Sequence, residues 1–191
     1  MKQEKSKISV LMSVYKKENP EYLRASLESI LVQTRTADEI LLIEDGPLTQ
    51  ELYQVVAEYQ KKCDYLHVHA MEQNVQLGRA LAKGVELCQY DLIARMDTDD
   101  IAMPHRLEKE GAYMEAHPEV DVVGGAIREF NDEGTIDRVK NMPKTQEEIL
   151  EYVKVRNPLN HMTVMYRKDS ILKAGNYKHF PFLEDYSLWS R

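Results

Sequence analysis

The 191-residue sequence predicts an α/β fold in which an open, mostly parallel β-sheet carries helices on both faces. Two observations support this prediction. Through the first half of the chain, apolar runs alternate with helical patterns, as in parallel strands joined by crossover helices. Two of those runs also end abruptly in acids, at Glu44-Asp45 and at Asp97, Asp99 and Asp100. Since open parallel sheets bind ligands beyond the carboxyl ends of their strands, these acids predict a ligand site at that edge.

The first two strands are predicted from runs of apolar and β-branched residues at 8–15 and 39–46. Such continuous runs are typical of central parallel strands that are covered on both faces. Pro20 suits a first helical turn after the first run. Apolar residues at helical spacing then predict one helix after each strand. These positions are Leu23, Leu27, Ile30 and Leu31 in the first helix, and Leu52, Val55, Val56 and Tyr59 in the second.

A third strand is predicted at 65–70, and a fourth in the stretch 92–100, where an apolar run ends in three carboxylates. A helix that opens at Asn74 is predicted between them. Beyond Pro104 the chain becomes less regular. We expect a helix at 106–117, a strand at 120–130, a turn at 131–134 and a capping box at Thr145 to Glu148 that starts another helix. A strand at 162–166, a short helix at 169–174 and a last amphipathic segment at 182–190 complete the prediction of one compact domain.

Composition excludes several classes of protein. The net charge of −7 and a pI near 5.4 argue against nucleic-acid binding, which needs a basic surface. The apolar runs are too short for a transmembrane segment, and no signal-peptide core follows the polar residues 1–7. Cys63 and Cys88 lack a CxxC spacing and are expected to be small buried hydrophobes, so a reducing, cytoplasmic setting is expected.

The aspartates after the fourth strand are the leading candidate for chemistry. Asp97 and Asp99 would leave the strand on the same side, and like charges held so close need a neutralising partner. Oxygen ligands favour Mg²⁺ or Mn²⁺, which usually bridge carboxylates to substrate phosphates. The alternative is a solvated acidic turn. No Gly-x-Gly-x-x-Gly follows the first strand and there is no P-loop, so a nucleotide would be held in another way.

Seven segments fall in an order that resembles the inverting family 2 glycosyltransferases, which have the nucleotide-diphospho-sugar transferase (GT-A) fold. They are VLMSVY at 10–15, LIEDG at 42–46, NVQLGRAL at 74–81, ARMDTDD at 94–100 with PHRL at 104–107, VGG at 123–125, HMTVMYR at 161–167 and EDYSLW at 184–189. The resemblance covers nearly the whole chain. It implies one catalytic domain over 1–191, with a nucleotide-binding half at about 1–103 and an acceptor-side half at about 104–191.

The resemblance implies a nucleotide pocket at the ends of the first two strands and of the fourth. Ser13 and Tyr15 would line the base and ribose, Asp45 would accept a hydrogen bond from the uracil N–H with Glu44 beside it, and Asp97 would face the ribose or the metal. For Ser13 and Tyr15 the alternative is polar packing at a strand end. For Asp45 it is an ordinary Asp-Gly turn.

The resemblance also implies the catalytic groups. Asp99, with Asp97, would bind the Mn²⁺ or Mg²⁺ that bridges the two phosphates. Asp185 would be the base that accepts the proton of the acceptor hydroxyl, and Glu184 would orient it. The alternative for both is that acids are favoured in the first turn of a helix. His161 would contact the diphosphate or donor sugar, or else be a structural histidine.

The implied activity is metal-dependent, inverting transfer of a sugar from a nucleotide-diphospho-sugar, with UDP expected, to a glycan or lipid-linked hydroxyl in surface polysaccharide synthesis. Because no Gln-x-x-Arg-Trp sequence is present, transfer of single sugars is expected rather than processive synthesis. Peripheral membrane association at the inner face is compatible with this role. The alternatives are a sugar nucleotidyltransferase, or a nucleotide- or metal-binding remnant without turnover. Relatives usually continue beyond the Glu184-Asp185 segment, so the chain resembles a C-terminally truncated form.

Overall fold

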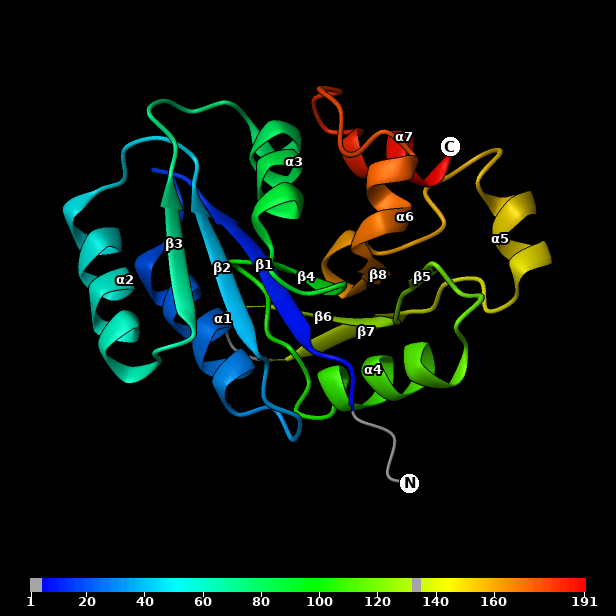
Figure 1. Ribbon diagram of the computed structural model, residues 1–191, viewed down its shortest axis with the longest axis horizontal. Helices are drawn as coiled ribbons and strands as arrows, with labels where there is room; N and C mark the ends of the chain where they lie inside the picture. The colour runs from blue at the N-terminus through cyan, green and yellow to red at the C-terminus, as the bar shows by residue number, and fades with distance from the viewer. Residues whose placement is uncertain (1–4, 132–134) are drawn as a thin grey trace.

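The computed structural model describes residues 5–131 and 135–191. A six-stranded sheet forms its centre, with the strand order β3-β2-β1-β4-β8-β5 (Figure 1). The strands β1, β2, β3 and β4 run parallel, whereas β8 is antiparallel to both β4 and β5. The strand bounds are β1 Ile8–Val14, β2 Glu39–Glu44, β3 Leu66–Ala70, β4 Leu92–Asp97, β5 Val122–Val123 and β8 Met165–Arg167. The predicted α/β class with a mostly parallel sheet is confirmed.

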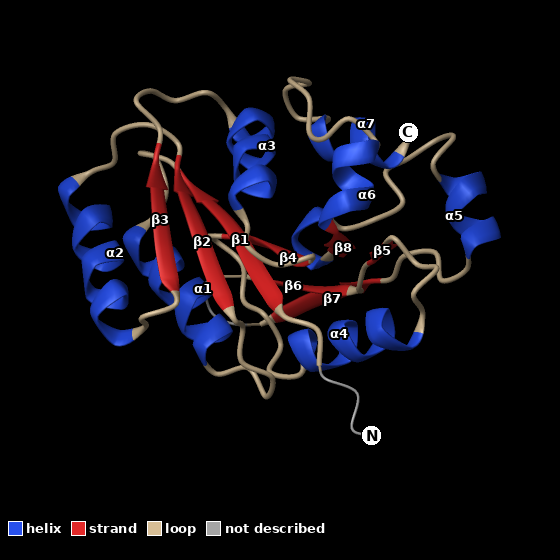
Figure 2. Cartoon of the chain, viewed as in Figure 1, coloured by secondary structure: helices blue, strands red, loops and turns tan. Residues whose placement is uncertain are grey.

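Helices cover both faces of this sheet (Figure 2). One apolar core lies between the sheet and the helices α1, α2 and α4, and a second core lies on the other face beneath α3, α6 and α7. The helix bounds are α1 Pro20–Leu31, α2 Gln50–Lys62, α3 Leu77–Leu87, α4 Arg106–Ala116, α5 Gln146–Tyr152, α6 Lys168–Lys173 and α7 Glu184–Trp189. None of these helices in the described parts of the chain is long and apolar enough to cross a membrane.

The register of the parallel strands brings the acidic strand ends together. Val14 of β1 pairs with Glu44 of β2, and Ser13 of β1 pairs with Asp97 of β4. The strand β1 is buried at every position except Ser13, which is half-buried, so its apolar run fixes it in the middle of the sheet. The central strand β1 therefore positions its two neighbours, β2 and β4, whose ends carry Glu44 and Asp97.

Two strand predictions in the second half are wrong in detail. Residues 120–130 do not form one strand: β5 ends at Val123, and β6 Ile127–Phe130 belongs to a separate two-stranded sheet with β7 Ile136–Lys140. Gly124 and Gly125 separate the two strands, and Thr163 holds this break because its Oγ1 accepts a hydrogen bond from the Gly125 N–H at 2.9 Å. Residues 161–163 form a 3-10 helix (η1 His161–Thr163), so only the end of the predicted strand at 162–166 is extended.

Other local predictions are confirmed. The side chain of Thr145 caps the Glu148 N–H, and the Glu148 side chain caps the Thr145 N–H in return, which begins α5 as expected for a capping box. Cys63 and Cys88 are buried, unpaired thiols. The predicted turn at 131–134 lies, apart from its first residue, outside the described residues.

Candidate functional site

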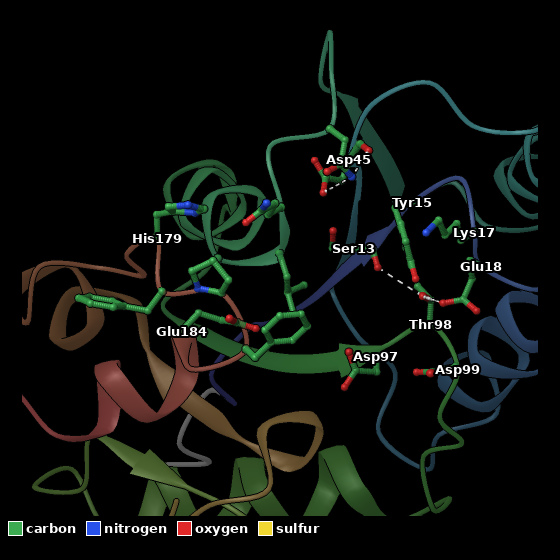
Figure 3. A pocket seen from close by; sticks show the side chains of 17 residues that line it. Ser13, Tyr15, Lys17, Glu18, Asp45, Asp97, Thr98, Asp99, His179 and Glu184 are labelled. Atoms are coloured by element: carbon green, nitrogen blue, oxygen red, sulfur yellow. Dashed lines mark hydrogen bonds between the residues drawn. The ribbon is translucent and has the colours of Figure 1, made fainter.

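A cavity of about 570 Å³ opens at the carboxyl ends of β1, β2 and β4 (Figure 3). This volume lies within the range of small-molecule sites. Its lining residues come from both halves of the chain: Ser13, Tyr15, Lys17, Glu18, Asp45, Asn74, Gln76, Leu77, Gly78, Asp97, Thr98, Asp99, His179, Phe180, Pro181, Phe182 and Glu184. The two acidic strand ends predicted to share an edge thus meet at one cavity.

The acids that follow β4 form a cluster in which one carboxylate oxygen each from Asp97, Asp99 and Asp100 lies within 4.8 Å of the others. Burial raises the pKa of Asp99 and Asp100, and repulsion from Asp97 adds to it, which brings the pKa of Asp100 to about 6. Three converging carboxylates form a hard, all-oxygen donor set. The residues therefore fit a divalent cation such as Mg²⁺ or Mn²⁺.

Arg95 was not anticipated as part of this cluster. It precedes Asp97 by two residues on β4, its side chain is 1% exposed, and its guanidinium Nη1 forms an ion pair with Asp97 Oδ2. The sequence does contain a sign of this pairing, because Arg95 stands within an otherwise apolar run that ends in acids. A charge on a central strand needs a buried partner.

The turn after β2 holds Asp45. Gly46 adopts a φ of +83°, and a Cβ atom there would lie 2.5 Å from the Asn74 backbone nitrogen, so this turn requires glycine. Asp45 accepts hydrogen bonds from Asn74 Nδ2 at 2.8 Å and from the Val75 N–H at 2.6 Å. Burial raises the pKa of the Asp45 carboxyl, and the hydrogen bond from Val75 opposes this rise. Glu44 is buried, with its pKa also raised by burial, and does not line the cavity.

The end of β1 forms a second wall of the cavity. Thr98 links this wall to the aspartate cluster, because its Oγ1 donates a hydrogen bond to Glu18 Oε2 at 2.7 Å. Ser13 and Tyr15 line the cavity as predicted from their place at the strand end, and Tyr15 is exposed. Glu18 adds a carboxylate that sequence reasoning did not assign to the site, since it lies in a polar loop without a recognisable pattern.

The opposite wall comes from the segment 178–184. In Figure 3, His179 and Glu184 approach the cavity from one side, and Asp97, Asp99 and Glu18 from the other. Gly78 on α3 permits this approach, because a Cβ atom at that position would lie 2.7 Å from the Lys178 carbonyl oxygen. Glu184 lines the cavity, whereas Asp185 does not and accepts a hydrogen bond from Asn157 Nδ2 at 2.5 Å.

His161 lies behind the cavity rather than on its wall. Its Nε2 is 2.9 Å from the Tyr177 hydroxyl, and its ring is 6.2 Å from the ring of Trp189. Burial, and to a smaller extent the charge of Arg95, lowers the pKa of this imidazole well below its usual value. The contact with a diphosphate or donor sugar stays a prediction, and in this fold the imidazole packs against the rings of Tyr177 and Trp189.

A mostly parallel sheet with an acidic cavity beyond its strand ends matches the GT-A fold of the nucleotide-diphospho-sugar transferases, to which the structural neighbours belong. The sequence profile described as Glycosyl transferase family 2 matches residues 9–178, and the chain belongs to this family.

Curated relatives agree with this assignment. The chain is 45% identical over 183 residues to the Amylovoran biosynthesis glycosyltransferase AmsE of Erwinia amylovora, covering 96% of this chain and 68% of the relative. It is 35% identical over 195 residues to the UDP-Gal:alpha-D-GlcNAc-diphosphoundecaprenol beta-1,3-galactosyltransferase of Escherichia coli, covering 99% of this chain and 68% of the relative.

Solved structures show the same fold at lower identity. The structure of S. aureus TarS 1–349 in complex with UDP-GlcNAc matches with a TM-score of 0.75 and 19% identity, covering 96% of this chain and 52% of that one. A mannosyltransferase from Pyrobaculum calidifontis, in complex with GDP-Man and Mn²⁺, matches with a TM-score of 0.66 and 13% identity, covering 92% of this chain and 48% of that one. The chain thus spans about half the length of these structures.

Proposed function

We propose that this chain transfers one sugar from a UDP-sugar to a hydroxyl of a glycan or lipid-linked acceptor, with inversion at the anomeric carbon and with a divalent cation. The observation that carries the proposal is the cluster of Asp97, Asp99 and Asp100 at the rim of a cavity that also contains Asp45. The E. coli relative is named for a UDP-sugar donor and a diphosphoundecaprenol-linked acceptor, and its name supports both substrate classes.

The donor half, about residues 1–103, would bind the nucleotide within a single domain over 1–191. Ser13 and Tyr15 line the part of the cavity assigned to the base and ribose. Asp45 has hydrogen-bond partners on both carboxylate oxygens, which fixes its orientation for accepting the uracil N–H. Glu44 lies behind the cavity and would support this turn rather than touch the nucleotide.

Asp97 and Asp99 are proposed to hold Mn²⁺ or Mg²⁺, with Asp100 beside them. A bound cation would offset the negative charge that builds on the departing diphosphate. The protein's own contribution is to keep these carboxylates close together at a strand end, where their repulsion favours a ligand of opposite charge.

We propose that the pair Glu184 and Asp185 supplies the base. The acceptor oxygen forms a bond to the anomeric carbon while the bond from that carbon to the diphosphate oxygen breaks. The hydroxyl proton passes to the carboxylate, and UDP leaves with the bonding electrons. Family resemblance assigns the proton to Asp185, while Glu184 is the member that lines the cavity. Substitution of each residue separately will decide between them.

A lipid-linked acceptor would place the reaction in the cytoplasm, at the inner face of a membrane to which the protein binds peripherally. The name of the E. coli relative supports this location, because its acceptor is carried on undecaprenol. Sedimentation of the protein with vesicles that contain a diphosphoundecaprenol-linked sugar, compared with vesicles that lack it, tests this part of the proposal.

The test of the activity is a transfer assay over a panel of nucleotide sugars and glycan acceptors, with Mn²⁺, Mg²⁺ or EDTA. We expect UDP release that depends on both acceptor and metal. Formation of a nucleotide sugar from a nucleoside triphosphate and a sugar phosphate would instead indicate a nucleotidyltransferase. Binding of UDP without turnover across the panel would indicate a binding remnant.

A further inference from the structure

Arg95 brings a positive charge into the sheet directly behind the aspartate cluster. Its side chain is 1% exposed and lies on the face of β4 that the buried Tyr166 and Tyr177 also occupy. Neither its Nε nor its Nη1 has a hydrogen-bond partner, so the contact of Nη1 with Asp97 Oδ2 is an ion pair. Among the described residues, Asp97 is the carboxylate with which it is paired.

The ion pair crosses the boundary between core and cavity. The Asp97 side chain is 27% exposed and lines the cavity, whereas its Oδ2 contacts a guanidinium that is sealed from solvent. Removing two charges from water is costly, and an apolar pair of similar size would often be as stable. The retention of a buried arginine at this point is thus poorly explained by stability alone.

We infer that Arg95 is a positioning residue for the metal site, an inference that rests on the proposed function. It holds Asp97 Oδ2 so that the carboxylate keeps one orientation and offers its other oxygen to the ligand. It also supplies a permanent positive charge beside three carboxylates whose oxygens lie within 4.8 Å of one another.

Arginine suits this task better than lysine. A guanidinium is planar, is always charged, and holds a carboxylate through a rigid set of donors, whereas an ammonium is a flexible point charge. The backbone also fixes this residue, because Arg106 Nη2 donates a hydrogen bond to the Arg95 carbonyl oxygen at 2.7 Å. Arg106 thus fixes the backbone of Arg95, and the ion pair fixes its guanidinium. The Asp97 side chain therefore has little rotational freedom.

The test measures Mn²⁺ binding directly, by the loss of the free-ion electron paramagnetic resonance signal in the presence of UDP. We expect Arg95→Met to weaken Mn²⁺ affinity at least tenfold, while UDP affinity measured in EDTA stays within twofold of the parent. Arg95→Lys keeps the positive charge but lacks the planar guanidinium donors, and it should weaken Mn²⁺ binding at least threefold. Either variant binding Mn²⁺ as tightly as the parent would overturn the inference.

Arg167→Met is the matched control. Arg167 is also a largely buried arginine, but it donates to the carbonyl oxygens of Val120, Met114 and His117, away from the aspartate cluster. Its loss should lower the melting temperature without changing Mn²⁺ affinity. If Arg167→Met weakens Mn²⁺ binding as much as Arg95→Met, the effect is general loosening of the fold and the inference fails.

A double-mutant comparison shows whether Arg95 acts through Asp97. In an Asp97→Asn background, replacing Arg95 by Lys should change Mn²⁺ affinity by less than twofold, because the partner is already lost. Independent, additive effects would contradict the inference. A parent protein that binds UDP but no Mn²⁺ would overturn both this inference and the metal-dependent function, whereas tight Mn²⁺ binding unaffected by Arg95 variants would overturn this inference alone.

Discussion

At the scale of single residues, Asp99 and Asp45 line the same cavity, and we propose separate roles for them. Replacing Asp99 by Ala removes one of the three converging carboxylates. We expect this change to abolish the part of UDP affinity that depends on Mn²⁺, because a cation held by these carboxylates would join the protein to the diphosphate. Titration calorimetry with UDP, in Mn²⁺ and in EDTA, measures this difference. A mutant that keeps the parent's metal dependence would remove Asp99 from the metal site.

Asp45→Ala should weaken UDP binding by about 1–3 kcal/mol, the usual cost of leaving a buried polar partner unsatisfied, while the dependence on Mn²⁺ persists. The same calorimetric titration gives both quantities. Binding of ADP by the unmutated protein is the control for base recognition. If ADP and UDP bind equally well, Asp45 does not read the uracil ring.

Glu184 on the opposite wall and its neighbour Asp185 give a third prediction. Asp185→Asn keeps the shape of the side chain and can still accept a hydrogen bond from Asn157, but it no longer accepts a proton. If Asp185 is the base, kcat should fall by the roughly 10²–10⁴-fold that general-base catalysis contributes, with UDP affinity unchanged.

Glu184→Gln is the comparison for that experiment. Family resemblance assigns the base to Asp185, whereas position in the cavity favours Glu184, which lines it. The two variants distinguish between these assignments. A loss of kcat confined to Glu184→Gln would move the base to Glu184. Parent-like rates in both variants would show that neither carboxylate takes the proton.

Sequence could locate these acids but not their surroundings. The strand-end acids Asp45 and Asp97 follow recognisable apolar runs, and parallel strands bring such ends together whatever the details of packing. Arg95 and Glu18 could not be assigned, because their roles depend on which residues approach from segments far along the chain. The turn of Asp185 toward Asn157 likewise depends on a contact across 28 residues that no local pattern encodes.

At the scale of elements, the segment before α7 combines strain with exposure. Phe182 adopts a φ of +67°, which is unfavourable for a bulky side chain, and it is 95% exposed at the cavity. Such strain persists only when other interactions or function maintain it. We interpret this segment as the acceptor wall of the site, with Phe182 as its most exposed aromatic surface.

Phe182→Gly should therefore leave the free energy of unfolding unchanged or raise it by up to about 1 kcal/mol, since glycine adopts positive φ without strain. Transfer to the acceptor should slow, with UDP affinity unaffected. Phe180→Gly, at a position with negative φ, should instead lower the free energy of unfolding. Chemical denaturation and steady-state kinetics measure both effects. A Phe182→Gly variant that is less stable than Phe180→Gly would contradict the strain interpretation.

Strands and helices could be predicted from sequence where the apolar pattern extends over many residues, but not where a strand has only two or three residues. Each of the first four strands is followed by enough helical periodicity to fix its type, and all four are correct. The strands β5 and β8 have two and three residues and lie in the sheet through pairing with each other and with β4. Tertiary pairing of this kind overrides local preference, which is why 120–130 was wrongly predicted as one strand.

At the scale of the whole molecule, a buried carboxyl on α4 makes stability depend on pH. Burial raises the pKa of Glu110 from 4.5 to about 7, although Arg106 lies 3.2 Å from its carboxylate and opposes the rise. The folded state then holds a proton that the unfolded chain releases. The stabilising contribution is complete below about pH 4.5 and is lost as pH rises toward 7.

We expect Glu110→Gln to flatten the fall of unfolding free energy between pH 4.5 and 7, a change on the order of 2–3 kcal/mol across that window. Urea denaturation at several pH values measures it. Glu72→Gln, an exposed change away from this helix, should leave the slope as it is. A slope of opposite sign in the parent would show that Arg106, rather than burial, controls this carboxyl.

The segment 178–184 rests on α3 at Gly78, where a side chain would collide with the Lys178 backbone. Asp45 and Asp97, the carboxylates proposed to bind the donor, lie at strand ends elsewhere in the chain. Substitutions can therefore change the proposed acceptor wall without changing the proposed nucleotide site, provided that residue 78 remains glycine. We expect lineages of such proteins to exchange acceptor hydroxyls more readily than nucleotide donors, so that closely similar chains build chemically different polysaccharides from one shared pool of activated sugars.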